Sequence, residues 1–337
     1  MKTFETLTWA GKLRRFRKLA EDALRQYEVT VKECHLLSYD TNIIYRVTAA
    51  DGTRYALRLA NGRWRTANDA ESEVSWLNAL AHDTAIPVPR ILPTRSGASL
   101  ATPQAEGTPA GHHAILMSWQ PGIVLGKQLS AANLQKMGEL FAQLHQHGKL
   151  WQPTAGFTTR RFEQFLSRGE EDRFLSDAFA VHYDPQTLKM LQLMRQRVES
   201  AYAALDPADL RVIHCDLWHD NIKIHKGVLY PFDFEDTIWG YRLHDIAMAM
   251  LDLYEDIGES EHYEALLAAF RRGYETHLAW PDGDMTLLQI GRILWRINFY
   301  TRYSVDWLKK DATFNAHLFQ RYLDSGKLLP PLRTPRA

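Results

Sequence analysis

The stretch His214-Cys215-Asp216-Leu217-Trp218-His219-Asp220-Asn221 decides which fold we expect for this chain. Its letters follow the pattern HxDxxxxN. Apolar residues precede it (Val212-Ile213) and follow it (Ile222-Lys223-Ile224), which indicates a loop that carries one Asp and one Asn out of the core. A second carboxylate, Asp233, comes twelve residues after Asn221, at the end of a short apolar strand.

Three of these side chains suit phosphoryl transfer. That reaction needs one carboxylate to orient and deprotonate an attacking hydroxyl. It also needs an amide and a second carboxylate to hold Mg²⁺ against the nucleotide phosphates. Asp216, Asn221 and Asp233 supply these groups in the required order.

The pattern resembles that of the aminoglycoside phosphotransferase and choline kinase family, the small-molecule branch of the protein-kinase-like fold, over about residues 30 to 330. The resemblance implies that Asp216 is the catalytic base and that Asn221 and Asp233 bind Mg²⁺. It also implies that Asp245, in a D-[IL]-A-like segment, braces the catalytic loop and that His214 is a structural residue bonded to a backbone group. ATP and Mg²⁺ are the implied cofactors. Homoserine-kinase-like and bacterial Ser/Thr-kinase-like relatives share this layout.

A zinc site is the alternative interpretation of the loop, because His214, Cys215 and His219 are all good zinc ligands. Their spacing lacks the regularity of CxxC or HxxxH motifs, which puts ligands on one side of a turn. Mg²⁺ prefers oxygen ligands and keeps several waters, so it suits Asn221 and Asp233 better.

Composition favours a two-lobed globular enzyme. The chain has 337 residues, of which 45% are hydrophobic and 11% aromatic. Forty basic residues balance forty acidic ones, so no global field would attract nucleic acid or an anionic membrane. Two cysteines do not suggest a disulfide framework, and no window reaches the roughly 18 apolar residues of a membrane span. We therefore expect a soluble cytoplasmic protein without a cleaved signal.

The periodicity of apolar residues predicts an α+β fold with two lobes. Residues 1–119 are expected to form a nucleotide-binding lobe with a small antiparallel sheet, and residues 120–330 a larger, mainly helical lobe that binds the substrate. The predicted strands are 29–37, 43–49, 54–59 and 113–119. The predicted helices are 9–26, 68–81, 130–146, 186–204, 260–277 and 285–308.

The small lobe lacks the glycine-rich loop that covers ATP phosphates in protein kinases. The turn Ser38-Tyr39-Asp40-Thr41-Asn42 stands in its place, and Ser38, Thr41 and Asn42 are candidate phosphate contacts. An ordinary polar hairpin is the alternative, because Asn and Asp also serve turn chemistry.

The family that the chain resembles has Lys or Arg on the third strand, and Arg58 stands there, so the resemblance implies that Arg58 neutralises the α- and β-phosphates. Glu73 on the following helix is the candidate carboxylate that orients Arg58 through a bidentate ion pair. Glu71 is the rival, because helix phase is uncertain by a residue or two. Adenine is expected against the backbone of residues 116–120, which includes Ser118 and Trp119; a buried edge strand is the alternative description of that segment.

The second metal-binding segment departs from the DFG triplet of protein kinases, because Glu235 stands where glycine would be. The connection from Asp236 to Tyr241 is also short. We therefore expect a constitutively assembled metal site without a long phosphorylatable activation loop. Glu235 and Asp236 either reach a second metal or face solvent.

The acceptor is less clearly indicated by the sequence. Four aromatic residues recur at i+4 spacing in the predicted helix 285–308, and three carboxylates follow the bracing segment, which would suit a cationic amino alcohol. Core packing is the alternative for the aromatic residues. Three arginines of that helix complicate a cationic acceptor and are equally consistent with a carboxylate-bearing one, such as an amino acid alcohol. The aromatic residues are Trp295, Phe299, Tyr303 and Trp307, the carboxylates Asp252, Glu255 and Asp256, and the arginines Arg292, Arg296 and Arg302.

The leading functional hypothesis is an ATP- and Mg²⁺-dependent phosphotransferase that acts on a hydroxyl of a small molecule, such as an amino alcohol, amino acid, sugar or aminoglycoside. A protein serine/threonine kinase of the same fold is the alternative enzyme. A nucleotide-binding scaffold without activity is the alternative from another class, and the complete set of Asp216, Asn221 and Asp233 argues against it.

Overall fold

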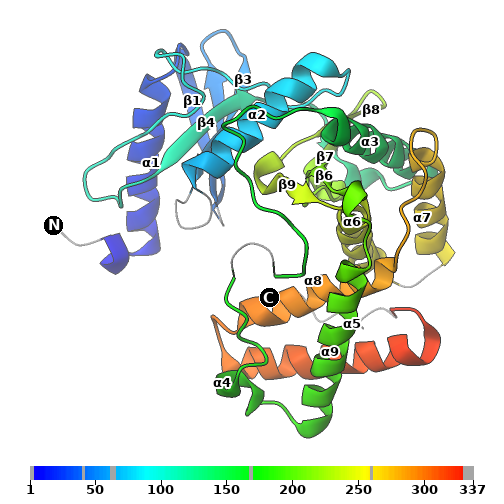
Figure 1. The fold of residues 1–337 in the computed structure, drawn as a ribbon. Helices are drawn as coiled ribbons and strands as arrows, with labels where there is room; N and C mark the ends of the chain where they lie inside the picture. Colours follow the sequence, from blue (N-terminus) through cyan, green and yellow to red (C-terminus); the bar gives the residue numbers. More distant parts are fainter. Residues whose placement is uncertain (1–3, 40–41, 61–65, 167–169, 259–260, 329–337) are drawn as a thin grey trace. The chain divides into compact units, whose positions relative to one another are not determined.

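The computed structural model describes residues 4–39, 42–60, 66–166, 170–258 and 261–328, which form two compact units (Figure 1). Unit 1 contains Met1–Gly122, Gln152–Thr159 and Tyr230–Glu235. Unit 2 contains Ile123–Trp151, Arg160–Leu229 and Asp236–Ala337. None of the helices within the described residues is long and apolar enough to cross a membrane.

Unit 1 is built on one antiparallel sheet with two long helices. Its strands are β1 (Val31–Tyr39), β2 (Asn42–Ala49), β3 (Arg54–Ala60) and β4 (His113–Ser118), in the order β1-β2-β3-β4. The helices are α1 (Trp9–Arg25) and α2 (Ala67–Asp83). The side chains of Thr8 and Thr66 cap the two helices, and Thr66 and Asp69 form a capping box. The sequence predicted these elements to within a few residues.

The alternation of side chains along β3 and β4 assigns one helix to each face of the sheet. Leu57 and Leu59 belong to a buried cluster with residues of α1. Ala56 and Ile115 belong to another cluster, together with Ala70 and Val74 of α2. Because successive strand residues point to opposite faces, Arg58 lies on the α2 face.

Unit 2 is mainly helical, with short strands around the HxDxxxxN loop. Strands β6 (Arg211–Ile213) and β9 (Ile238–Gly240) pair antiparallel, and a second sheet has the order β5-β7-β8, formed by Ile123–Val124, Ile222–His225 and Val228–Pro231. The longer helices are α3 (Ala131–Leu150), α5 (Pro185–Ala203), α6 (Arg242–Ile257), α7 (Glu261–Tyr274), α8 (Met285–Tyr300) and α9 (Val305–Ser325); α4 (Asp177–Ala180) is a single turn.

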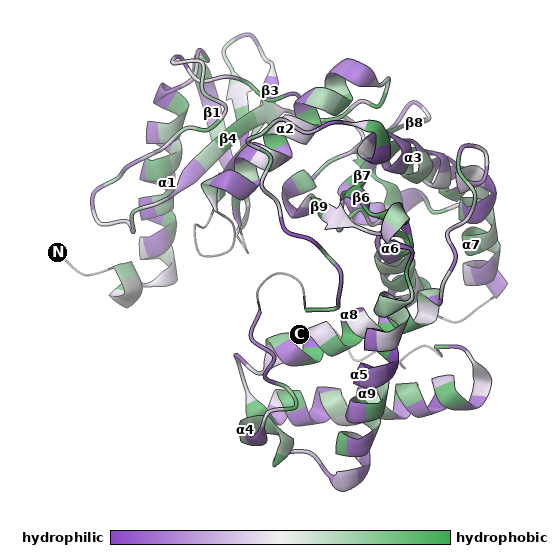
Figure 2. Cartoon of the chain, in the orientation of Figure 1, coloured by the Kyte–Doolittle hydropathy of each residue, from purple (hydrophilic) through white to green (hydrophobic). Residues whose placement is uncertain are grey.

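The prediction of one helix over 285–308 was wrong. The chain turns after Tyr300, where the Thr301 hydroxyl donates to the carbonyl oxygen of Asn298, and a new helix begins at Val305. Ser304 caps that helix by accepting from the Trp307 backbone N–H. The sequence analysis also missed α6 and the greater part of α9. Both colours run along α9 in Figure 2, as expected for a helix with one buried and one exposed face.

Helices α3 and α7 pack closely because glycines lie at their crossing. A Cβ atom added to Gly138 would lie 1.9 Å from the carbonyl oxygen of Phe270. One added to Gly273 would lie 1.8 Å from the carbonyl oxygen of Gln135. Since both obstacles are backbone atoms, no side-chain rotation can relieve the overlap, and these positions require glycine.

We expect Gly273→Ala to destabilise the protein by about 2 kcal/mol or more, because the helices must separate. At an unconstrained helix position the same change would stabilise by up to about 1 kcal/mol, so the sign is diagnostic. Thermal unfolding measured by calorimetry checks the prediction. Gly156→Ala is the control, since its added Cβ meets no atom within 4 Å. A Gly273→Ala protein as stable as the wild type would contradict the close crossing.

Candidate active site

The HxDxxxxN loop brings two of the predicted site residues together in unit 2. The side-chain amide of Asn221 donates to the Asp216 carboxylate at 3.1 Å and to the Asp216 backbone carbonyl at 2.8 Å. A single 3₁₀ turn, His219–Asn221, leads from the loop into β7 and turns Asn221 back toward Asp216. Asp216 is partly exposed, and its role as the catalytic base stays a prediction.

The buried carboxylate of Asp245 fixes the backbone of the HxDxxxxN loop. Asp245, at the start of α6, accepts the Cys215 backbone N–H at 2.7 Å, and its other oxygen lies 3.0 Å from Nε2 of His145 on α3. The imidazole is held in turn by the Tyr274 hydroxyl, 2.9 Å from Nδ1. Cys215 has a φ of 67°, an unfavourable backbone region for a side chain other than glycine, so this hydrogen bond stabilises a strained loop.

The pKa of Asp245 is lowered despite its burial. Desolvation by itself raises the pKa of this carboxyl. The hydrogen bond from His145 and the nearby imidazoles of His145, His214 and His244 lower the pKa by more than desolvation raises it. The ionised form is therefore favoured, which suits an acceptor of a backbone N–H. His214 is fully buried and accepts the Asp216 backbone N–H on Nδ1 at 3.4 Å, a bond to the backbone as expected for a structural residue.

Asn221 is oriented so that its amide oxygen can serve a metal ion. Both hydrogen bonds of its side chain are donated by the nitrogen, so Oδ1 points away from Asp216 and accepts no hydrogen bond from any described residue. An amide oxygen of this kind suits Mg²⁺, which needs few protein ligands. Within the described ranges, no three His, Cys, Asp or Glu side chains gather to hold a metal by themselves.

Unit 1 contains the predicted ion pair between strand and helix. Both terminal nitrogens of the Arg58 guanidinium, Nη1 and Nη2, donate to the Glu73 carboxylate, with Nη1–Oε1 at 3.0 Å. Both side chains are buried. The rival residue, Glu71, is exposed. The pair forms because Arg58 and the buried side of α2 face each other across the same side of the sheet.

Two further carboxylates surround Arg58. Asp233 lies 3.8 Å and Glu235 3.9 Å from Nη1, so one guanidinium faces three carboxylates. Burial lowers the pKa of Arg58, but Glu73 first, then Glu235 and Asp233, raise it more, and the net pKa lies above its ordinary value. Among these four side chains, three carboxylates surround one guanidinium. Asp233 has a φ of 65°, a strained conformation common at functional sites.

The sequence left open whether Glu235 reaches a second metal or faces solvent. It accepts a hydrogen bond from the Asn42 side chain, and it is mostly buried beside Arg58. Asn42, a candidate phosphate contact, thus also positions this carboxylate. Ser38 is exposed at the end of β1, and Thr41 lies outside the described residues. The only sequence signal for Glu235 was its position after Asp233.

The backbone of the predicted adenine segment is already bonded at two donors. The Ser118 N–H donates to the Arg90 carbonyl at 2.9 Å, and the Trp119 N–H to the Arg54 carbonyl at 3.2 Å. The Ser118 hydroxyl oxygen accepts the Arg90 N–H. The contact of these two residues with adenine stays a prediction.

The predicted cation box is largely neutralised within unit 2. Glu255 forms a bidentate ion pair with Arg296 at 2.7 and 2.9 Å, and Asp256 lies 2.8 Å from Nε2 of His219. The aromatic ridge is shorter than predicted. Trp295 stacks on Phe299, whose ring also contacts Tyr303 in the turn, whereas Trp307 lies in the first turn of α9 and contacts Tyr300. Prediction of a single four-residue ridge was wrong because the helix ends at Tyr300.

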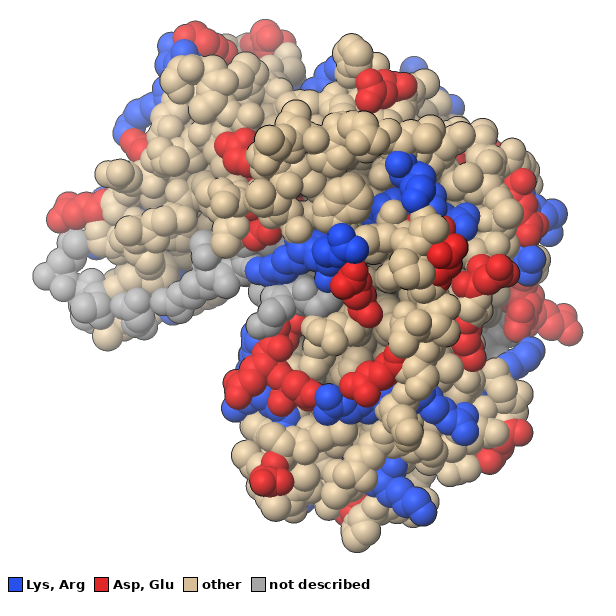
Figure 3. Space-filling view, in the orientation of Figure 1, with Lys and Arg blue, Asp and Glu red and all other residues tan. Residues whose placement is uncertain are grey.

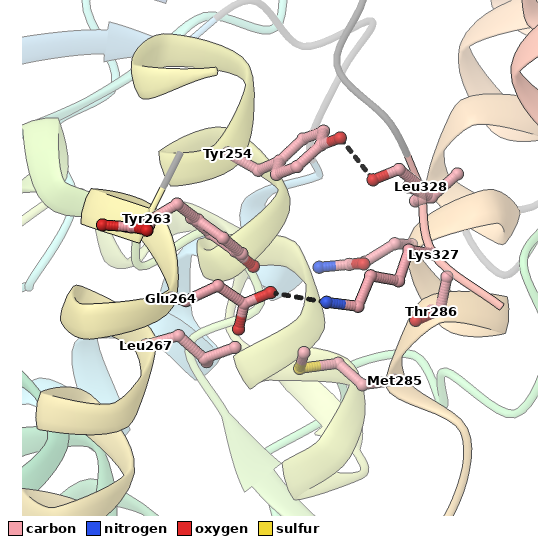
Figure 4. A pocket seen from close by; sticks show the side chains of 10 residues that line it. Tyr254, Tyr263, Glu264, Leu267, Met285, Thr286, Lys327 and Leu328 are labelled. Carbon is pink, nitrogen blue, oxygen red and sulfur yellow. Dashed lines mark hydrogen bonds and ion pairs between the residues drawn. The ribbon is translucent and has the colours of Figure 1, made fainter. Parts of the chain in front are cut away.

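Cavities lined by the described residues of unit 2 include a larger and a smaller one. The larger, about 1410 Å³, is lined by His219 and Asp220 of the HxDxxxxN loop, by Glu255 and Arg296, and by residues of α9. The smaller, about 510 Å³, contains no predicted site residue. Figure 4 shows that Lys327 reaches across it to Glu264, at 3.3 Å. The larger cavity is therefore the one adjacent to the catalytic loop.

Comparisons with known proteins identify the family to which the chain belongs. Residues 40–283 match the family model described as the phosphotransferase enzyme family. Since the match covers more than half of the chain, the protein belongs to that family. The protein sll1119 of Synechocystis sp., itself uncharacterised, is 34% identical over 231 residues, 66% of this chain and 61% of that protein. The chain thus spans less than two thirds of this relative's length.

Solved structures establish the fold class as protein-kinase-like. A microcompartment-associated aminopropanol kinase is 20% identical, with a TM-score of 0.72 over 92% of this chain and 98% of that one. The amicoumacin kinase hAmiN, in complex with AMP-PNP, Ca²⁺ and Ami, is 16% identical, with a TM-score of 0.75 over 97% and 98%. A spectinomycin phosphotransferase with ADP and spectinomycin has a TM-score of 0.58 at 12% identity, over 92% and 94%. At these identities the likeness shows the α+β fold expected from the sequence.

A buried histidine beside Arg58 makes the stability of the protein depend on pH. Burial, then the Arg58 charge, lower the pKa of His113 to about 4. In the unfolded chain the imidazole gains its proton below about pH 6.5. The unfolded state therefore takes up the proton first as the pH falls, and stability is lost between about pH 6.5 and 4.

We expect His113 to account for a loss of about 2 kcal/mol between pH 7 and pH 5, and His113→Gln to remove that part of the slope. Denaturant unfolding at pH 7, 6 and 5 measures it. His82→Gln, at an exposed position, should keep the wild-type slope. Equal slopes for His113→Gln and the wild type would refute the assignment.

Proposed function

We propose that the protein is an ATP- and Mg²⁺-dependent phosphotransferase that moves the γ-phosphate to a hydroxyl of a small molecule. The observation that carries the proposal is the Asp216–Asn221 pair on a loop held by buried Asp245. Membership of the phosphotransferase enzyme family supports it. The solved structures of similar fold, which contain ADP or AMP-PNP together with a second small molecule, support nucleotide use.

The proposed nucleotide-binding residues lie in the lobe of residues 1–119. Arg58, oriented by Glu73, would neutralise the α- and β-phosphates, since its planar guanidinium is fixed by a bidentate partner. The turn between β1 and β2 would approach the outer phosphates, and the end of β4 would contact adenine. The residues assigned to these two contacts are Ser38, Thr41, Asn42, Ser118 and Trp119.

The proposed metal ligands are the amide oxygen of Asn221 and the carboxylate of Asp233. Both are oxygen donors, and the three carboxylates around Arg58 outnumber its single positive charge, so the residues present fit Mg²⁺. When bound, the ion would neutralise the charge that develops on the transferred phosphoryl group.

Asp216 performs the proton transfer in the proposed reaction. Its carboxylate accepts the proton of the acceptor hydroxyl while that oxygen forms a bond to the γ-phosphorus. The bond from the γ-phosphorus to the bridging oxygen breaks, and ADP leaves with the bonding electrons. Asn221 keeps the carboxylate oriented through its hydrogen bond. The site contributes mainly alignment and charge neutralisation, as phosphoryl transfer requires.

Asp216→Asn is expected to lower kcat by about 10²- to 10⁴-fold, the usual worth of a positioned general base, and to leave nucleotide affinity nearly unchanged. ADP release with Mg²⁺ and ATP, across amino alcohols, amino acids, sugars and aminoglycosides, measures it. Asp282→Asn, at an exposed residue of unit 2, is the control. Full activity in Asp216→Asn would show that this residue is not the base.

Asp233→Asn is expected to weaken Mg²⁺-dependent nucleotide binding by at least about tenfold, since it removes a charged ligand. Titration of a non-hydrolysable ATP analogue with and without Mg²⁺ measures the effect. Glu71→Gln, an exposed change in unit 1, should bind as the wild type does. Unchanged Mg²⁺ dependence in Asp233→Asn would exclude this residue as a ligand.

A further inference from the structure

One arginine of unit 2 lies beside the proposed catalytic base without being fully bonded. Nη2 of Arg292, on α8, is 3.8 Å from Oδ1 of Asp216, and its guanidinium carbon lies 4.4 Å from the centre of the Trp295 ring. Its side chain is 26% exposed. Among the described residues it donates no hydrogen bond at normal distance. Several of its five N–H donors therefore remain available to a ligand.

The aromatic platform under Arg292 is fixed by its own contacts. The Trp295 indole N–H donates to Glu170 at 2.7 Å, and the ring stacks on Phe299 with centroids 5.5 Å apart. The side-chain oxygen of buried Asn298 accepts the backbone N–H groups of residues 173 and 174, which holds the segment after Glu170 against α8. The guanidinium is thus supported on a surface that cannot easily rotate away.

The next arginine along α8 shows what a neutralised guanidinium looks like here. Arg296, one helical turn later, is occupied by the bidentate pair with Glu255. Burial raises the pKa of Asp252, and this effect outweighs the nearby charges of Arg292 and Arg296, which lower it. The net shift favours the uncharged acid. The positive charge of Arg292 is therefore balanced less completely than that of Arg296.

Figure 3 shows Lys and Arg interspersed with Asp and Glu on the face of the molecule in view, so discrimination by charge must come from local groups.

We propose that Arg292 determines specificity by binding an anionic group, a carboxylate or a phosphate, on the small alcohol that Asp216 deprotonates. The inference rests on the proposed function and names the acceptor class for the same site. Asp216 and Arg292 lie only 3.8 Å apart. If the acceptor hydroxyl bonds to Asp216 and the acceptor anion bonds to Arg292, each at about 2.8 Å, only a short carbon chain fits between the hydroxyl and the anion. A planar guanidinium can bind either anion through two parallel hydrogen bonds.

An acceptor that carries only an ammonium group fits this corner poorly. Its charge would face the Arg292 guanidinium, while Glu255 and Asp256 already have cationic or imidazole partners. The aminopropanol kinase has a similar fold, but the likeness at 20% identity does not extend to its acceptor. The anionic group thus distinguishes the proposed acceptor from a simple amino alcohol.

Matched pairs of acceptors test the proposal directly. Homoserine and 3-aminopropan-1-ol, and threonine and 1-aminopropan-2-ol, differ only by the carboxylate. Glycerol 3-phosphate and glycerol differ only by the phosphate. We would measure kcat/KM for each by ADP release, and binding of each to full-length protein loaded with a non-hydrolysable ATP analogue and Mg²⁺. The wild type should prefer the anionic member of at least one pair, and which pair responds identifies the anion.

Arg292→Met should lower that preference by about 10- to 100-fold, the range expected when a hydrogen-bonded charge partner is lost. Arg292→Lys should restore part of it, because it retains the charge without the fork. Arg302→Met is the control: Arg302 also lies over an aromatic ring of α8, but it is exposed. Its preference should equal that of the wild type.

The outcomes separate the two proposals. Turnover that favours the amine members, or an equal loss on both members in Arg292→Met, would overturn the anion-binding role and leave the kinase activity standing. An equal loss would mean that Arg292 only supports Asp216. If neither turnover nor binding of any anionic acceptor is found although Mg²⁺–ATP binds, the inference fails. If the wild type does not bind Mg²⁺–ATP, the proposed function itself fails.

Discussion

The buried carboxylate of Asp245 is the constraint on which the catalytic loop depends. It accepts a backbone N–H from Cys215, whose positive φ would otherwise make the loop conformation costly, and it is anchored to α3 through His145. An ionised group without a partner could not be buried at this position. The imidazole and the backbone N–H together compensate for desolvation, so they hold in place the strained loop that carries Asp216, the proposed catalytic base.

In unit 1 the buried charged group that needs a partner is a cation, Arg58, rather than a carboxylate. Arg58 is buried, and only the bidentate bond to Glu73 and the neighbouring carboxylates make that burial tolerable. Those carboxylates include Asp233 and Glu235, so the pair that stabilises the strand and helix also sets the charge around the proposed metal ligand. Stability and function are therefore coupled at this point. A change to Arg58 would affect both.

The helix α8 carries a different kind of arrangement, in which aromatic stacking positions charge. Trp295 is fixed by Glu170 and Phe299, and Arg292 lies on its ring beside Asp216. Because Arg296 is neutralised by Glu255 one turn away, two arginines on one helix have different electrostatic roles. Packing thus decides which positive charge is available to a ligand.

The sequence by itself determined the fold class, the family and the elements of unit 1, because alternation, capping residues and the HxDxxxxN spacing are local signals. It also indicated the Arg58–Glu73 pair, since a strand and the following helix leave few possible partners. Tertiary structure alone decided the break after Tyr300, the bond between Asn42 and Glu235, and the approach of Arg292 to Asp216. These contacts join residues up to 193 positions apart, and which side chains meet at such separation depends on how the helices pack rather than on any local pattern.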